Sequence, residues 1–365
     1  MGRRILLVGP INDQGKGGRF EEMRLWGKFL LELENEVVVF SMFNSHFPIE
    51  NATMIESAIL NWPRTWSNFP YLRKFILRVW GSRIFKSKRD LFYESGVWKN
   101  FASTFDHILL FITHQSKEMS IFNLTIPATQ SIRFTGTIHD FSVLNHQVNY
   151  PFLLKRNYVF HSPSLSKGLE TTVTKYFIDQ TTLAENQLLQ IPLSGSFNIF
   201  AMIGLFMEVK QIEKVIHLFR EFPSYKLILF GSGALQANFE KSIEEQKLTN
   251  VKIAGFFPPS RIDEVYAQID CLIINSNEET GPMTGTEAMA AGKLILSRPV
   301  GAMSDRVEGL DLIYDSIADL RFKIKELEKK SDRELLQIKR TLRERYLERY
   351  SNKKLKAEIK SLIDQ

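Results

Sequence analysis

Two glutamates, Glu279 and Glu287, stand eight positions apart on either side of a Gly-Pro loop. The apolar run 271–276 before the loop predicts a buried strand, and 284–291, closed by Gly292, predicts a helix. In open α/β sheets ligands gather beyond the carboxyl ends of the strands, and free N–H groups at a helix N-terminus suit phosphate. A carboxylate in the first helical turns can accept hydrogen bonds from a vicinal diol. The segment therefore predicts a site for a ligand with phosphate and hydroxyl groups.

The two glutamates and the following Ala-Met-Ala-Ala-Gly resemble the E-x(7)-E motif of retaining family-4 glycosyltransferases, which have the GT-B fold, and of their bacterial surface-polysaccharide type. The resemblance implies that Glu287 binds the ribose hydroxyls of a nucleotide. It implies that Glu279 faces the donor sugar as a catalytic residue and that the loop binds the donor through Gly281, Pro282, Met283 and Thr284. The alternative is a surface acid pair at a helix start.

Residues 203–206, Ile-Gly-Leu-Phe, and Lys210 resemble the family's Gly-Arg-Leu…Lys loop, whose Arg and Lys hold the donor diphosphate. The resemblance places Gly204 and Lys210 at the donor. Leu205 stands where the family usually has arginine, and a lysine alone offers a point charge without the bidentate geometry. Arg261 and Arg298 are candidates to replace the missing cation. A solvated helix lysine is the alternative for Lys210.

Two more segments resemble parts of the family's nucleotide site. Residues 230–233 resemble its strand-ending Gly-x-Gly and include Gly233. Residues 251–257 resemble the strand and loop that receive the base, which places Gly255 and either Phe256 or Phe257 near it. A phenylalanine that simply belongs to the core is the alternative for the last assignment.

The first apolar run is followed by Gly-Lys-Gly-Gly at 15–18. The spacing is not that of a P-loop, because Gly17 stands where Ser or Thr is needed, nor that of a dinucleotide G-x-G-x-x-G. A NAD-dependent dehydrogenase is therefore disfavoured. The segment resembles the family's flexible Gly-Gly loop, which implies that Gly17 and Gly18 close over the distal phosphate of the donor and the acceptor. A simple strand–helix turn is the alternative.

Residues 137–141, Thr-Ile-His-Asp-Phe, end another predicted strand and resemble the family's His-Asp segment. The resemblance implies that His139 points into the cleft towards the donor sugar and takes part in catalysis. A structural histidine is the alternative.

Alternating short apolar runs and longer helical patterns predict parallel α/β domains over the 365 residues. We expect a GT-B architecture, two Rossmann-like domains facing across a cleft. The expected boundaries are 1–187 for the N-terminal acceptor-side domain and 188–345 for the C-terminal nucleotide-sugar-binding domain. Residues 346–365 are expected to form a C-terminal helix that can cross back to the N-terminal domain. The predicted strands are 4–9, 37–43, 106–113, 133–138, 158–161, 197–204, 226–230, 251–254, 271–276, 294–297 and 310–314, with helices at 20–33 and from 331, and a linker at 178–196.

The composition excludes several classes of protein. Cys271 is the single cysteine, which excludes an internal disulfide framework and a Cys-cluster zinc site. No Asp-x-Asp pattern is present, so we expect no catalytic metal and no cofactor besides the nucleotide sugar as co-substrate. No apolar run approaches the roughly 20 residues of a membrane-spanning helix. We expect a cytoplasmic protein, peripheral on the inner face of the cytoplasmic membrane.

The positive charge is concentrated in residues 61–100, which hold nine Lys and Arg residues against two acidic ones, while the whole chain has a net charge of +6. Four of the five tryptophans are in the same segment. Cations interleaved with aromatic side chains suit an anionic membrane surface. Nucleic acid, which we do not expect as a partner, and an ordinary solvated helix are the alternatives.

The sequence thus predicts a retaining glycosyltransferase that moves a sugar from a nucleotide-sugar donor to a hydroxyl of a lipid-linked saccharide in polysaccharide biosynthesis. Two alternatives stay open: a nucleotide-sugar epimerase on the same fold, and a non-catalytic GT-B partner protein, for which Leu205 is the main argument.

Overall fold

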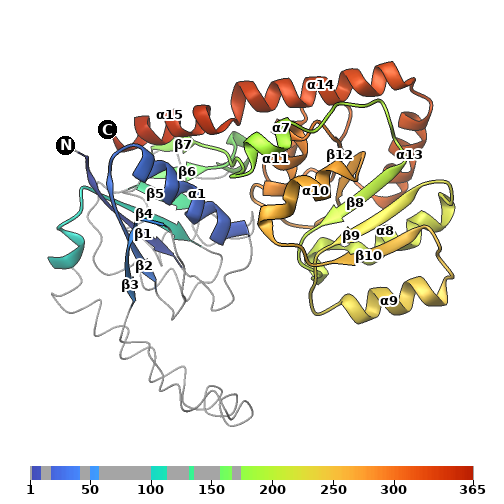
Figure 1. Cartoon of the computed structure of the whole chain (residues 1–365), viewed down its shortest axis with the longest axis horizontal. Helices are drawn as coiled ribbons and strands as arrows, with labels where there is room; N and C mark the ends of the chain where they lie inside the picture. The colour runs from blue at the N-terminus through green and yellow to red at the C-terminus, as the bar shows by residue number, and fades with distance from the viewer. Residues whose placement is uncertain are drawn as a thin grey trace, which may run out of the picture. The chain divides into compact units, whose positions relative to one another are not determined.

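The computed structural model describes residues 2–9, 18–41, 50–56, 100–112, 131–134, 157–166 and 174–364. The chain divides into two compact units (Figure 1). The first comprises Met1–Phe160, Ser166–Phe177 and Glu358–Gln365, and the second comprises His161–Leu165 and Ile178–Ala357. Among the described helices, none combines the length and the apolar character needed to cross a lipid bilayer.

The first unit contains a parallel sheet in the order β3-β2-β1-β4-β5-β6-β7. Its interior strand β1 is fully buried at Ile5, Leu6, Leu7 and Val8, as an apolar run covered on both faces must be. Helix α1 (Gly18–Glu32) buries Met23, Trp26 and Leu30. The strands are β1 (Arg4–Gly9), β2 (Glu36–Ser41), β3 (Thr53–Glu56), β4 (His107–Ile112), β5 (Ser131–Phe134), β6 (Asn157–Phe160) and β7 (Lys175–Phe177).

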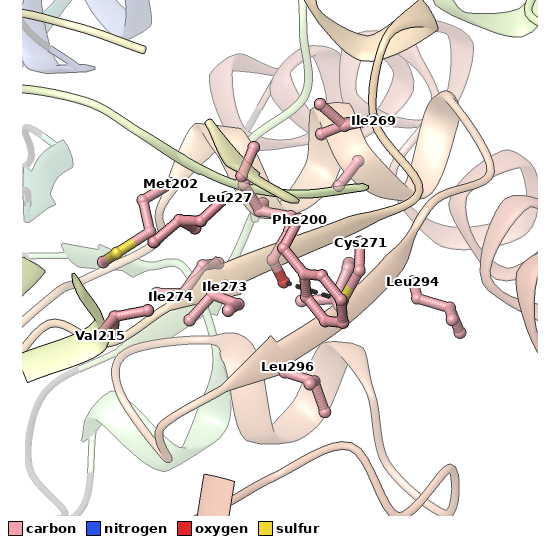
Figure 2. Packing of buried hydrophobic residues seen from close by; sticks show 14 of the residues in the cluster. Phe200, Met202, Val215, Leu227, Ile269, Cys271, Ile273, Ile274, Leu294 and Leu296 are labelled. Atoms are coloured by element: carbon pink, nitrogen blue, oxygen red, sulfur yellow. Dashed lines mark hydrogen bonds between the residues drawn. The ribbon is translucent and has the colours of Figure 1, made fainter. Parts of the chain in front are cut away.

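The second unit contains a parallel five-stranded sheet in the order β10-β9-β8-β11-β12. Figure 2 shows its core, where Phe200 of β8, Cys271 of β11 and Leu294 of β12 lie in one apolar layer. Burial raises the pKa of the Cys271 thiol, so this cysteine is a neutral core residue. The strands are β8 (Ile199–Ile203), β9 (Lys226–Phe230), β10 (Val251–Gly255), β11 (Cys271–Ile274) and β12 (Leu294–Ser297).

The strand order of the second sheet creates a switch point. The chain begins at β8, adds β9 and β10 on one side, and then returns to add β11 and β12 on the other. The connections that leave β8 and β11 therefore diverge, which opens a crevice outside their carboxyl ends.

The helices of the second unit follow these strands. A capping box opens α14, the helix predicted to begin at 331: the Glu334 amide donates to Ser331 Oγ (3.4 Å), and the Ser331 amide donates to Glu334 Oε2 (2.8 Å). The α-helices are α7 (Glu185–Leu189), α8 (Ile212–Leu218), α9 (Gln236–Glu245), α10 (Ile262–Ala267), α11 (Met283–Ala290), α12 (Met303–Arg306), α13 (Ile317–Glu328), α14 (Asp332–Arg349) and α15 (Asn352–Ile363).

Three expectations differ from the structure. The predicted strand 310–314 is wrong: only one bridge joins Ile313 to Ser297, because Asp311, with a φ of 53°, is not extended. The short edge strands β3 and β7 escaped prediction, since three or four residues show no clear periodicity. The expected linker 178–196 contains α7, whose five residues are too few for a helical pattern.

Candidate functional site

A hollow opens at the switch point of the second sheet, beyond the carboxyl ends of β8 and β11. The loops after these two strands are tied together, because the Asn277 amide donates to Val209 O (2.8 Å) and the Asn275 side chain to Gln211 O (2.9 Å). Four of the residues predicted for the site line this hollow: Gly204, Lys210, Glu279 and Thr284.

An ion pair lies in the hollow. Lys210 sits at the end of a 3-10 helix (Glu208–Lys210) that follows β8, and its ammonium group donates to Glu279 Oε1. Ser276 Oγ donates to the same oxygen at 2.8 Å. Both side chains of the pair keep part of their surface accessible, 26% for Lys210 and 17% for Glu279. A cation and an oriented carboxylate, both partly accessible, are therefore available to a ligand.

The N-terminus of α11 borders the hollow. Gly281 and Pro282 are buried, Pro282 is the N-cap residue, and the Gly285 amide donates to Pro282 O (3.0 Å). Within the described part of the chain, no acceptor pairs with the amides of Met283 and Thr284. The start of α11 thus offers two N–H groups and the positive end of the helix dipole, and its Thr284 lines the hollow together with Lys210, an arrangement suited to an anion.

Glu287 lies further along α11, outside the lining of the hollow, and is 9% exposed. The Tyr266 hydroxyl, from α10, lies 3.2 Å from Glu287 Oε2 and 2.9 Å from the Thr284 carbonyl oxygen, and donates to these acceptors. Burial, together with the Glu287 carboxylate, raises the pKa of Tyr266, which therefore remains a neutral donor. The Tyr266 hydroxyl therefore orients the Glu287 carboxylate. Tyr266 was not predicted from the sequence as a partner of Glu287.

The predicted glycines have different roles. Gly204 has a φ of 147°, and a Cβ there would meet the Lys210 side chain at 3.7 Å. A Cβ on Gly233 would lie 2.5 Å from the Phe206 carbonyl oxygen, so Gly233 permits two loops to pack closely. Gly255 has a φ of 82°, and its carbonyl accepts from the Gly231 amide at 2.8 Å. Gly233 and Gly255 shape the loops without lining the hollow.

The position without the family's arginine is open to solvent. Leu205 lines the hollow and is 41% exposed. Of the two candidate replacements, Arg261 is held by Glu264 through two hydrogen bonds (2.8 and 2.5 Å). Arg298 follows β12 and donates to Asn277 Oδ1 at 2.6 Å, in the loop that carries Glu279. Of the two candidate arginines, Arg298 is therefore the one that contacts the loop carrying Glu279.

Other predicted residues lie elsewhere. Phe256 is 57% exposed after β10, with its ring nearly parallel to that of Phe257 at 6.4 Å, while Phe257 packs on the core. Gly18 is the first residue of α1 and is exposed. Gly17, His139 and nearly all of segment 61–100 fall outside the described residues.

A buried network behind the loop was not predicted. Arg306 pairs with Asp179, and His161 lies against Gly281. His161 is the last residue of the predicted strand 158–161, so the strand-end position used for His139 could have singled it out. Arg306 and Asp179 show no such signal, because Arg and Asp side chains are usually exposed to solvent.

The segment 185–344 matches the family model described as glycosyl transferases group 1. No protein of curated function matches the chain. Among solved structures, sucrose-phosphate synthase from Thermosynechococcus elongatus is similar, with a TM-score of 0.72 and 16% identity over 100% of this chain and 98% of that one.

Two further solved structures are similar over 100% of both chains. S. aureus TarM, in a complex with fondaparinux, alpha-GlcNAc-glycerol and UDP, has a TM-score of 0.69 at 12% identity. Anabaena HepE, in a complex with UDP and glucose, has a TM-score of 0.69 at 14% identity. The chain therefore has the GT-B fold, an α/β fold with two Rossmann-like units, and its residues 185–344 are similar to group 1 glycosyl transferases.

Proposed function

We propose that the protein is a retaining glycosyltransferase that moves a sugar from a nucleotide-sugar donor to a hydroxyl of a saccharide acceptor. The observation that carries the proposal is the hollow at the switch point of the second sheet. There Lys210 and Glu279 form an ion pair, and Thr284 at the start of α11 lines the same hollow. The match of 185–344 to group 1 glycosyl transferases supports the same reaction.

The chemistry requires charge to be stabilised on a leaving diphosphate. The bond between the anomeric carbon and the phosphate oxygen breaks, and the acceptor oxygen bonds to that carbon from the same face. The acceptor proton passes to the departing phosphate. We assign the growing negative charge to the Lys210 ammonium and the amides of Met283 and Thr284, because preorganised donors stabilise such charge without reorganisation. Glu279 faces the sugar, Glu287 holds the ribose, and no metal is part of this scheme.

The first unit supplies the acceptor side in this proposal. His139 and the Gly17–Gly18 loop face the donor sugar and its distal phosphate. The acceptor is a lipid-linked saccharide of polysaccharide biosynthesis, and the basic, aromatic segment 61–100 docks on the anionic inner face of the cytoplasmic membrane. Reversing the charges of Arg73, Lys74 and Arg78 should release the protein from anionic vesicles, whereas continued binding contradicts the docking.

A thermal-shift panel tests the donor. UDP-, GDP- and ADP-sugars are compared, with UDP-sugars first because TarM and HepE were solved with UDP. A ligand at a hundred times its Kd stabilises the folded state by about 2.7 kcal/mol. One base should therefore raise the melting temperature clearly above the others, and an absence of any shift contradicts the proposal.

Glu287→Ala then tests the site by calorimetry. Loss of hydrogen bonds to a charged group should weaken nucleotide binding by about tenfold or more. Glu264→Ala is the matched control, because Glu264 is an exposed glutamate of the neighbouring helix α10. Equal affinities of the two variants contradict the role of Glu287.

The exposed Leu205 favours one second candidate, a GT-B protein that binds nucleotide without transfer. Turnover distinguishes the two: transfer to an added acceptor supports the enzyme, and nucleotide binding with no transfer to a matched acceptor supports the partner protein. Inversion of the free donor sugar without acceptor would instead indicate an epimerase.

A further inference from the structure

Arg306 ends the short helix α12 and is fully buried. Its Nε and Nη2 atoms donate to the two carboxylate oxygens of Asp179 at 2.8 and 2.6 Å. Its remaining terminal nitrogen, Nη1, donates to the carbonyl oxygen of Pro282 at 2.6 Å. One guanidinium therefore joins a buried carboxylate to the N-cap residue of α11.

The charge of this group is secured by its partner. Burial opposes the charged form of Arg306, but the adjacent Asp179 carboxylate outweighs that effect and raises the pKa of the guanidinium. The arginine is consequently a permanent cation with three well-directed hydrogen bonds, which a lysine cannot reproduce.

The same segment fixes a second carbonyl of the loop. The Ala302 amide donates to Thr280 O at 2.8 Å, and Gly301, with a φ of 55°, leaves room for that oxygen, since a Cβ there would lie 2.1 Å from it. The carbonyls of Thr280 and Pro282 are thus both held by residues 301–306. The next two amides of the chain, those of Met283 and Thr284, have no acceptor among the residues that the structure describes.

Two glycines of the loop region make room for the network. A Cβ on Gly285 would lie 3.0 Å from Arg306 Nη1 and 2.6 Å from Met303 Sδ. A Cβ on Gly281 would lie 2.7 Å from the ring of His161, whose Nδ1 is 3.8 Å from Asp179 Oδ1. The absence of side chains at these two positions lets the buried groups approach the backbone of the loop.

We propose that Arg306, held by Asp179, is a positioning residue that keeps the start of α11 in the conformation that binds the donor phosphates. Arg306 itself does not line the hollow. The inference rests on the proposed function, because it assigns phosphate to the free amides of Met283 and Thr284. The inference also specifies which part of the ligand is affected. Loss of the network weakens contacts to the phosphates and leaves contacts to the nucleoside unchanged.

The test separates positioning from stability. Removing Arg306 alone would leave Asp179 buried and uncompensated, whereas replacing a whole buried ion pair by apolar residues is often neutral for stability. The main variant is therefore Asp179→Leu with Arg306→Met, and Arg306→Lys is the conservative one. Dissociation constants are measured for UDP, GDP and ADP and for the corresponding nucleosides, beginning with the base that binds the wild-type protein.

For the double variant we expect the diphosphate affinity to fall about tenfold while the nucleoside affinity is kept. Arg306→Lys should change the affinities in the same direction by less. Arg343→Met is the control, because Arg343 donates to Ala290 O (2.9 Å) at the other end of α11 and to Ile191 O (2.7 Å). It should lower the melting temperature and leave the ratio of the two affinities unchanged.

An unchanged ratio in the double variant overturns the inference, as does a parallel loss of both affinities or a changed ratio in Arg343→Met. Each of these results leaves the proposed function intact as long as the wild-type protein binds a nucleoside diphosphate. If the wild-type protein binds none of the three, the proposed function fails, and the positioning role fails with it.

Discussion

The carboxyl and amino edges of the sheet β10-β9-β8-β11-β12 both carry charged groups. The two edges differ in whether these groups are accessible or are satisfied by hydrogen bonds within the protein. At the carboxyl edge Lys210 and Glu279 are partly accessible, and two amides of α11 have no acceptor among the described residues. At the amino edge Asp270 accepts from the amides of Asn198 (2.9 Å) and Ile199 (3.0 Å), and Lys339 donates to Ser196 O (2.6 Å). Polar groups satisfied within the protein stabilise the fold, and unsatisfied ones are available to a ligand.

The largest effect on stability is expected at the amino edge. Asp270→Ala removes a buried carboxylate and leaves Lys339, which is fully buried, without its nearest negative charge. The free energy of unfolding in urea should fall by about 3 kcal/mol, with nucleotide affinity unchanged at temperatures where the variant is folded. Asp311→Asn is the control, because the Asp311 side chain is 85% exposed in its ion pair and asparagine tolerates the φ of 53° at this position, so the change should cost less than about 1 kcal/mol. Weaker nucleotide binding by Asp270→Ala would contradict the separation of the two edges.

The opposite result is expected at the carboxyl edge. Lys210→Met removes the one cation of the Lys210–Glu279 pair, so affinity for a nucleoside diphosphate should fall about tenfold. The melting temperature should change little, because the pair is partly solvated. Calorimetry and thermal unfolding of the same preparation measure both quantities, and a large loss of stability with unchanged affinity would reverse the assignment.

A gain of function is expected at Leu205. Leu205→Arg adds a guanidinium to the lining of the hollow and should tighten diphosphate binding by about fivefold, an effect that weakens as salt is raised. Met207→Arg is the matched control, since Met207 is 49% exposed in the same loop but does not line the hollow. Equal gains in both variants would indicate a general charge effect.

The smallest effect is a pH dependence of the amino edge. Burial, with the nearby positive charge of Lys339, lowers the pKa of Lys293 to about 8. Between this value and the ordinary lysine pKa the unfolded chain binds a proton that the folded chain does not, so stability rises with pH. The melting temperature should increase by about 2 °C from pH 8 to pH 10. Lys293→Met should reduce this increase, and an equal increase in the variant would exclude Lys293 as its source.

Much of the second unit could be predicted from the sequence. Strands β9 and β12 begin and end at the predicted residues, because the strands of a buried parallel sheet contain short continuous runs of apolar residues. The loop with Glu279 and the helix with Glu287 also follow from local signals, the Gly-Pro pair and Gly292.

The pairing of Arg306 with Asp179 could not be predicted. These residues come from distant positions in the chain, and no local pattern shows that Arg306 will be buried against a loop carbonyl. The need for glycine at Gly285 and Gly301 could not be predicted for the same reason. The atoms that a Cβ would contact at these positions belong to distant segments. Predictions from spacing find residues that act within one element and miss those that act between elements.

The division of the chain has a consequence for synthesis on the ribosome. The first unit includes Glu358–Gln365, where Asp364 reaches to 3.7 Å from the guanidinium of Arg3. Every residue of the second unit precedes this segment. The first unit, most of which is translated first, therefore cannot complete its fold until the second unit has been synthesised.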